Sequence, residues 1–394
     1  MINDSLLRSL HSHLAWWGLK RFTSDDDYFA WQRKQLSPAD LTQLNAQVER
    51  KRGGERRDEV AFYDLTAQPR ILPVLYSQRY EYYCEIGSYV VARFGEANNI
   101  LDFGCGVGIL ATFYATQHPE KQFVGIDRSP ASIAVAREKA LELGLSNVRF
   151  ECVDVEAGNL AGSYDLIVAT HSLVQAEQEP GIPSHSWQTF ERPRDAKQQV
   201  AFEQRTGLGI RLDRLSASLV KNGRMIVFEK TRQLARRVPF QRALAERGLQ
   251  LIEAPKPIRY QVVEEVADDG PFYFTQKERE APLHWDESPE PDEGRPFDRS
   301  KPETGATNPD VPLYENHWPS AQRVWKQLHN MHLLKETTRQ EPDGRQLHVE
   351  LGQAEEGAYL YCANTLDQRQ LVLVESARIA DLESYYQEIA SSAP

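Results

Sequence analysis

The chain has 394 residues, of which 41% are hydrophobic and 26% charged, and its formal net charge is −11. This length exceeds one ordinary domain, and the hydrophobic content is sufficient for a packed core. The acidic balance disfavours non-specific binding to nucleic acid. The four cysteines form no CxxC pair and no zinc spacing, and no stretch is apolar enough for a membrane span or a cleavable signal. We therefore expect a cytoplasmic protein with reduced cysteines and no membrane anchor.

Residues 1–84 predict a helical extension. Its first helix is marked by apolar residues that recur on one helical face: Leu7, Leu10, Leu14 and Trp17. Two further helices are expected over 28–34 and 37–50, and the charged run 50–57 predicts a solvated loop. His11 and His13 have no further ligand-type residues at metal-binding spacing, so no metal site is predicted.

A tyrosine-rich segment, 69–89, follows and leads directly into the next strand. Its tyrosines recur at helical spacing, which is typical of a buried helix face: Tyr76, Tyr80, Tyr82, Tyr83 and Tyr89.

The most informative stretch is 99–108, in which an apolar run enters Asp102 and glycines then occupy alternate positions: Gly104, Gly106 and Gly108. This pattern predicts a strand and a tight turn where the backbone closely approaches a ligand, because glycine adopts positive φ and has no Cβ. A helix predicted over 109–117 would present its first N–H groups to the same ligand. The dinucleotide fingerprint G-x-G-x-x-G is not met, because its third glycine position is Ile109.

Acidic residues end the next two predicted strands. The strand over 121–127 ends in Asp127, and after a helix over 131–143 the strand over 147–155 carries Asp154. A fourth strand, 163–172, has a continuous apolar run typical of a parallel strand that is buried on both faces. A fifth strand over 224–230, a helix over 238–248 and short apolar runs near 249–253, 260–266 and 272–275 complete this region.

The order D-x-G-x-G-x-G from Asp102, followed by these acids, resembles the class I S-adenosylmethionine (SAM)-dependent methyltransferases. The resemblance covers roughly residues 85–277 and implies an α/β fold with a doubly wound, mostly parallel, seven-stranded Rossmann-like sheet and closing antiparallel strands. It identifies the superfamily and does not select a member.

The resemblance implies that SAM is the cofactor. An acid about 20 residues beyond the glycine loop suits the ribose hydroxyls, and this position is Asp127. Asp154 would contact the adenine amino group, and the N–H of Val155 a ring nitrogen. The alternatives are a helix-capping role for Asp127 and an Asx turn at Asp154. The other predicted cofactor residues are Asp102, Gly104, Cys105, Gly106, Gly108, Arg128, Thr170, Tyr76 and Arg79.

Tyr76 and Arg79 are expected at the methionine end of the cofactor, and the N-terminal helices are either a lid or a packed extension. The fourth strand's end would lie beside the sulfonium, which makes His171 a candidate general base for a hydroxyl or amine acceptor. The alternative is a structural histidine, and Glu177 and His185 are weaker candidate bases. Because the strand end reads Thr170 to Leu173, it lacks the Asn/Asp-Pro-Pro-Tyr signature of nucleic-acid amino methylation.

The remaining segments predict the domain organisation. An 85–278 SAM-binding core contains a substrate-side insertion at 174–210. A proline-rich linker or arm at 279–319 leads to a small α+β module at 320–394, which has four strand signals between two helices. This module could form a homodimer, bind a partner or cover the active site.

The leading prediction is a SAM-dependent methyltransferase that acts on a small-molecule acceptor. The first alternative is a protein or RNA methyltransferase that docks its substrate through the C-terminal module. The second is a SAM-binding regulatory protein without catalytic activity.

Overall fold

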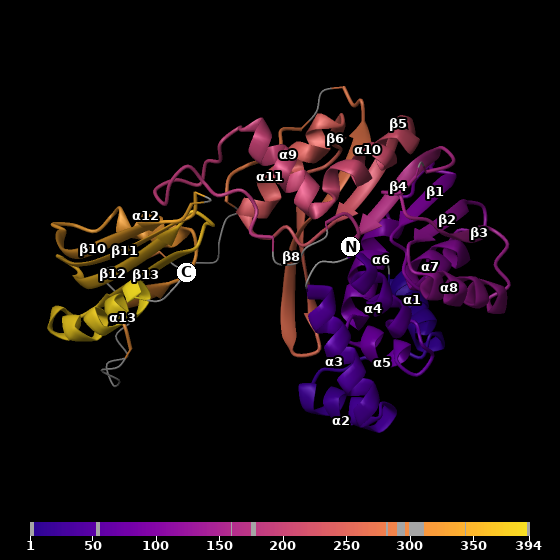
Figure 1. The fold of residues 1–394 in the computed structure, drawn as a ribbon, viewed down its shortest axis with the longest axis horizontal. Coiled ribbons are helices and arrows are strands. Elements are labelled where there is room, and N and C mark those ends of the chain that lie inside the picture. The colour runs from indigo at the N-terminus through magenta and orange to yellow at the C-terminus, as the bar shows by residue number, and fades with distance from the viewer. Residues whose placement is uncertain are drawn as a thin grey trace. The chain divides into compact units, whose positions relative to one another are not determined.

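A computed structural model describes residues 4–52, 56–158, 160–174, 179–280, 283–289, 296–298, 311–342 and 344–391 (Figure 1). The chain divides into two compact units. Unit 1 comprises residues 1–179, 200–232 and 240–285, and unit 2 comprises residues 180–199, 233–239 and 286–394. Among the described residues, no helix has both the length and the apolarity that crossing a membrane requires.

Unit 1 is built on one central sheet. Its strands are β1 (Asn99–Phe103), β2 (Gln122–Asp127), β3 (Val148–Cys152), β4 (Tyr164–Thr170), β5 (Leu219–Phe228), β6 (Leu249–Leu251), β7 (Lys256–Val262) and β8 (Glu265–Lys277). The order is β3-β2-β1-β4-β5-β8-β6, and β7 pairs with β8 beside this path. Strands β1 to β5 are parallel, whereas β8 runs antiparallel to β5, β6 and β7. The predicted α/β fold class with a mostly parallel central sheet is confirmed, and seven strands form the main path of this sheet, with β7 paired beside it.

The strand order explains where a ligand can bind. The chain builds outward from β1 in one direction through β2 and β3, and in the other through β4 and β5. In open α/β sheets, the crevice at such a reversal, outside the carboxyl ends of the strands, is the usual ligand site. The apolar run of β4 is buried on both faces, since residues 166–169 are at most 1% exposed. This burial fixes the strand's register and therefore the position of its carboxyl end.

Helices surround this sheet. The N-terminal extension contains α1 (Asp4–Trp16), α2 (Asp25–Gln35), α3 (Pro38–Arg52), α4 (Arg56–Thr66), α5 (Leu72–Ser77) and α6 (Tyr80–Val91). The later helices are α7 (Ile109–Gln117), α8 (Pro130–Glu142), α9 (Ala196–Thr206), α10 (Leu208–Ser218) and α11 (Leu234–Glu246). Leu10 and Leu14 of α1 share a buried core with α6, α7 and the sheet.

The charged run 50–57, predicted to be a solvated loop, is largely helical. Helix α3 continues to Arg52 and α4 begins at Arg56, and residues 53–55 lie outside the described residues. Basic side chains at the end of α3 are favoured by the partial negative charge of a helix C-terminus. The run of charges therefore ends one helix and begins another.

Unit 2 contains an antiparallel sheet in the order β10-β11-β12-β13-β9. The strands are β9 (Tyr314–Asn316), β10 (His332–Gln340), β11 (Gln346–Ala354), β12 (Gly357–Asn364) and β13 (Arg369–Val374). Alternating residues of β12 enter different cores. Tyr359 and Tyr361 pack with α12 (Ser320–Trp325), whereas Leu360 packs with α13 (Ile379–Ser391). Strand β9 falls in the predicted linker and is ordered by its pairing with β13.

Part of the predicted 174–210 insertion belongs to this second unit. The Trp187 ring stacks on His348 of β11 with a centroid distance of 3.6 Å. The fully buried Arg192 side chain forms an ion pair with Asp367. Arg369, only 1% exposed, donates a hydrogen bond to the Thr189 carbonyl. Residues 180–199 are thus held by the C-terminal sheet.

Candidate functional site

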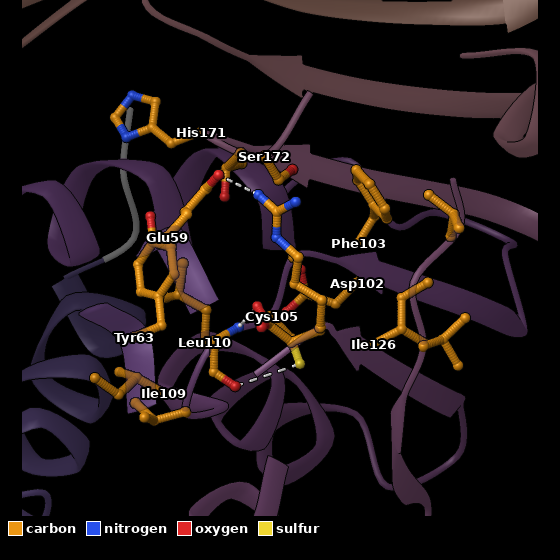
Figure 2. Close-up of a pocket in the computed structure, with 18 of the residues that line it drawn as sticks. Glu59, Tyr63, Asp102, Phe103, Cys105, Ile109, Leu110, Ile126, His171 and Ser172 are labelled. Atoms are coloured by element: carbon orange, nitrogen blue, oxygen red, sulfur yellow. Dashed lines mark hydrogen bonds and ion pairs between the residues drawn. The ribbon is translucent and has the colours of Figure 1, made fainter. Parts of the chain in front are cut away.

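A pocket in unit 1 lies at the carboxyl ends of β1, β2 and β4 (Figure 2). In Figure 2, Glu59 and Tyr63 lie on one side of it, and Phe103 and Ile126 on the other. His171 and all the predicted cofactor residues except Gly108 line this pocket: Tyr76, Arg79, Asp102, Gly104, Cys105, Gly106, Asp127, Arg128, Asp154, Val155 and Thr170. The fold therefore brings together residues from five separate segments of the chain.

Three glycines shape the turn after β1, each for a different reason. All have positive φ: 73° at Gly104, 54° at Gly106 and 85° at Gly108. A Cβ on Gly104 would lie 2.3 Å from the Cβ of Ser172, so the turn approaches the end of β4 closely. A Cβ on Gly108 would lie 2.9 Å from the Ala136 Cβ, so this glycine permits helix packing rather than lining the pocket. At Gly106 no atom lies within 4 Å, which leaves open space inside the pocket.

Asp127 organises the turn after β2. Its two carboxylate oxygens accept hydrogen bonds from the N–H groups of Gly106, at 3.0 Å, and Ser129, at 2.8 Å. Each oxygen has a further lone pair for a ligand hydroxyl. Burial raises the pKa of Asp127. The cap of α8 is provided by Ser129, whose Oγ accepts the N–H of Ser132 at 3.0 Å.

The pocket also contains a carboxyl group, Asp102, and a guanidinium cation, Arg79, that form no ion pair with another described residue. Asp102 is 6% exposed, and burial, reinforced by the charge of Asp127, raises its pKa to about 7. Among the described residues, the Asp102 carboxyl has no hydrogen bond or ion pair, and the Arg79 guanidinium has no carboxylate partner. Arg79 instead lies over the Tyr82 ring, 5.8 Å from its centroid. These two groups are complementary to a ligand that carries both charges.

Helix α4 adds residues that the sequence analysis missed. Glu59 forms an ion pair with Arg128, directly after Asp127 (Figure 2). Asp64 accepts hydrogen bonds from the Ser129 Oγ at 2.6 Å and the Ala131 N–H at 3.2 Å. The helix was missed because the charged run before it predicts a loop, although Ala61 and the buried Leu65 are four residues apart, which is a helical spacing.

His171 follows β4 and has a left-handed backbone with φ 53°, which is uncommon outside glycine. Its ring lies between those of Tyr82 and Phe228, with centroid distances of 5.0 and 5.1 Å. Nε2 lies 3.1 Å from the Asp269 carboxylate, which also accepts a hydrogen bond from the Tyr260 hydroxyl. Burial lowers the pKa of His171 to about 4, and the contact with Asp269 offsets only part of this effect. The imidazole is therefore neutral at pH 7 and able to accept a proton.

Arg211 on α10 and Glu156 after β3 also line the pocket, where they form an ion pair with an N–O distance of 2.6 Å. They belong to no recognised motif. The apolar spacing of Leu208, Leu212 and Leu215 is a helix signal, but it crosses the boundary assumed for the insertion. Within the described ranges, no group of three or more His, Cys, Asp or Glu residues is arranged to hold a metal ion. Glu177 lies outside the described residues, and His185 belongs to unit 2.

Residues 95–227 match a family model described as a methyltransferase domain. The malonyl-[acyl-carrier protein] O-methyltransferase of Acetivibrio thermocellus is 38% identical over 71 residues, which cover 18% of this chain and 24% of that protein. The release factor glutamine methyltransferase of Escherichia coli is 24% identical over 157 residues, which cover 39% of this chain and 56% of that protein. The chain thus spans between about a quarter and just over half the length of these curated relatives.

Among solved structures, the N-methyltransferase NodS of Bradyrhizobium japonicum, in complex with S-adenosylhomocysteine (SAH), has a TM-score of 0.34 and 17% identity. The similarity covers 50% of this chain and 87% of NodS. Because the family model spans β1 to β5 and the glycine turn, the family assignment rests on that match and on the order of the motifs. Residues 95–227 form a methyltransferase domain, and this region has the glycine turn and motif order that resemble the class I SAM-dependent methyltransferases.

Proposed function

We propose that the protein transfers the methyl group of SAM to a small-molecule acceptor. The observation that carries this proposal is the distribution of charge in one pocket. Asp127 and Asp154 follow β2 and β3, whereas Arg79 and Asp102 provide an unpaired cation and acid. An adenosyl group needs hydroxyl and amine acceptors, and the amino-acid end of SAM needs both charges. The residues present fit this cofactor.

The adenosyl end would be held by the turns after β2 and β3. Asp127 is already oriented by two backbone N–H groups, so its carboxylate can accept ribose hydroxyls without reorganisation. Asp154 forms an Asx turn in which Oδ1 accepts the Glu156 N–H at 3.1 Å. This turn and an adenine contact are compatible, because the second carboxylate oxygen lies outside the turn.

The methionine end would be held by Arg79 and Asp102. Arg79 would pair with the cofactor carboxylate and Asp102 with its ammonium group, while Tyr76 lines the same pocket. Open space at Gly106 would allow the backbone to approach the bound cofactor. The two charges of the cofactor's amino-acid group would then each face an opposite charge, which lowers the cost of burying this zwitterion.

Bound SAM supplies an activated methyl group, so the protein chiefly has to position the acceptor and exclude water. Orientation alone can contribute roughly 7–11 kcal/mol to lowering the barrier. His171 would accept the proton of a hydroxyl or amine acceptor, and Asp269 would stabilise the resulting imidazolium. Tyr82 and Tyr83 are 4% and 7% exposed and would help to keep water from the reacting atoms.

The small-molecule class is supported by the aromatic side chains that line the pocket. Tyr63, Tyr76, Tyr82 and Tyr83 line it from α4, α5 and α6, so helices of unit 1 cover the carboxyl edge of the sheet. Concave pockets lined by aromatic side chains suit small ligands.

The proposal can be tested in two steps with the full chain. Isothermal titration calorimetry with SAH should show binding, which Asp127→Ala should weaken by about a hundredfold or more if two charged hydrogen bonds are lost. Methyl transfer from radiolabelled SAM to a fractionated cell extract should then label the low-molecular-weight fraction. Label in protein or RNA would overturn the acceptor class. SAH binding without transfer to any fraction would indicate a non-catalytic protein, and absence of SAH binding would overturn the cofactor assignment.

A further inference from the structure

The loop His171–Leu173, which we name the β4 loop, is held on three sides. The carboxylate of Glu229, 2% exposed, accepts the N–H groups of Ser172 and Leu173, both at 2.6 Å. On a second side, Ser172 contacts the glycine turn at Gly104, where no Cβ could be accommodated. On the third side, Nη1 of Arg211 donates to the carbonyls of Ser172, at 3.1 Å, and Leu173, at 2.9 Å. This loop begins with His171, at the proposed methyl-transfer end of the pocket.

The same guanidinium also holds the segment that follows β3. Nε and Nη2 of Arg211 donate to Oε1 of Glu156, at 2.9 and 2.6 Å. Glu156 follows Asp154 and Val155, the segment proposed to contact adenine, and its own N–H is bound to Asp154. Arg211 is 3% exposed, so water does not replace these bonds when they are lost. A single side chain thus connects the adenine segment to the β4 loop.

The rigid geometry of the guanidinium couples the position of Glu156 to that of the β4 loop. Its guanidinium is planar, with donors in a fixed fork, so a shift of Glu156 must rotate or translate Nη1 relative to the β4 loop carbonyls. Glu229 meanwhile restrains the N–H groups of the same residues. The β4 loop is therefore fully hydrogen-bonded only when the adenine segment has the position seen here.

We propose that Arg211 is a positioning residue through which occupation of the adenine end of the pocket orders the β4 loop and, with it, His171. The inference rests on the proposed function, since it assumes that the cofactor's adenosyl group contacts residues 154–156. It implies an ordered reaction in which the cofactor binds first and completes the acceptor side of the pocket. Arg211 itself takes no part in methyl transfer.

The alternative is that Arg211 only stabilises the fold. Amide hydrogen exchange measured on the full chain distinguishes this structural role from the positioning role. The amides of Ser172 and Leu173 report directly on opening of the β4 loop, because both are bonded to Glu229. Saturating SAH should slow their exchange by about tenfold or more in the wild-type protein, as expected when a ligand suppresses local opening. In Arg211→Gln this slowing should fall below about twofold, while SAH affinity changes by less than about fivefold.

Two further variants sharpen the test. Glu156→Gln removes the charge that anchors Arg211 to the adenine segment and should reduce the slowing in the same direction. Arg247→Gln is the matched control, because Arg247 also bridges two acids, Glu203 and Asp213, each at 2.8 Å, but does not line the pocket. It should leave the effect of SAH on the β4 loop unchanged.

Each other result has a defined meaning. Undiminished slowing in Arg211→Gln, or no slowing in the wild type despite SAH binding, overturns the inference. A loss of SAH affinity greater than about a hundredfold in Arg211→Gln also overturns it, because Arg211 would then be a direct cofactor ligand. If Arg211→Gln does not fold, as judged by circular dichroism, Glu156→Gln decides the question. Failure of the wild type to bind SAH instead contradicts the proposed function.

Discussion

At the residue scale, two glycines with similar backbone conformations have different roles because they lie in different parts of the fold. Gly106 and Gly144 both have left-handed backbone, with φ 54° and 64°, and a Cβ at either would meet no atom within 4 Å. Only Gly106 lines the pocket, whereas Gly144 follows α8. Substitutions at these two glycines therefore distinguish the effect of backbone strain from the effect of lost ligand space.

Gly106→Ala and Gly144→Ala should each lower the free energy of unfolding by about 1–2 kcal/mol, because an L-residue is strained at positive φ. Only Gly106→Ala should also weaken SAH binding, and Gly106→Val should weaken it further, since the added carbons occupy ligand space. Urea denaturation and calorimetric titration measure the two effects. Equal SAH affinity in both alanine variants would contradict the placement of the cofactor.

Asp102 should make cofactor binding pH-dependent. Burial raises its pKa from 3.8 to about 7, so lowering the pH below 7 protonates the group proposed to pair with the cofactor ammonium. We expect SAH affinity to fall as the pH decreases from about 7.5 to about 5.5, and Asp102→Asn to bind weakly with a flatter profile over that range. Wild-type affinity that stays constant across this interval would be incompatible with the proposed role.

The same shift predicts a stability effect of known sign. The folded state of the unliganded protein holds the Asp102 proton more tightly than the unfolded state, so this group's contribution to stability falls as the pH rises from 3.8 to about 7. Asp102→Asn should therefore unfold at higher denaturant concentration than the wild type at about pH 8. A variant less stable than the wild type at that pH would show that Asp102 has a stabilising partner.

At the element scale, α4 connects the N-terminal extension to the cofactor turn. Asp64 receives two hydrogen bonds from the start of α8, and Glu59 is paired with Arg128. The turn that orients Asp127 is therefore supported by a helix more than sixty residues earlier in the chain. Glu59 and Tyr63 of the same helix also line the pocket, so α4 contributes to the pocket directly.

Asp64→Ala should destabilise the protein by about 1–2 kcal/mol, the usual cost of removing a helix-capping oxygen, and should also weaken SAH binding. Asp58→Ala is the control on the same helix. The contact of Asp58 with Arg57 is long, at 3.9 Å, and does not involve the turn after β2. Thermal unfolding measures the stability of the two variants, and titration with SAH measures their cofactor affinity. An unchanged SAH affinity in Asp64→Ala would mean that α4 does not support the cofactor turn.

Elements were predictable where their signal is local. Helix α7 has the predicted bounds, Ile109–Gln117, and β2 lies within the predicted strand, because apolar periodicity and glycine turns define both. Helix α10 was missed since its apolar face spans an assumed boundary. Strand β9 was missed because three residues have little periodicity and become a strand only by pairing with β13.

At the scale of the whole molecule, the division into units differs from the linear order of segments. Residues 180–199 and 233–239 follow the regions of β4 and β5, yet both are grouped with the C-terminal sheet. Deletion of 320–394 would therefore remove the partners of Trp187 and Arg192 rather than detach an independent module.

Asp367→Ala should destabilise unit 2 alone. It leaves the fully buried Arg192 without its carboxylate, which typically costs about 3–5 kcal/mol. Calorimetry should show an earlier transition for unit 2, and SAH affinity should be preserved because all pocket residues belong to unit 1. Arg194→Ala, which removes an 84% exposed side chain, should have little effect on either. A loss of SAH affinity in Asp367→Ala would show that the pocket depends on unit 2.

The sequence by itself determined the parallel α/β core, the glycine turn and the acids that follow β2 and β3. These features depend on local periodicity, on glycine's access to positive φ and on the short distance between a strand and its own turn. Only the tertiary structure decided that Glu59 and Arg211 share a pocket with Asp102, and that residues 180–199 join the C-terminal sheet. Such contacts arise from burial and charge pairing between distant segments, which no local spacing encodes.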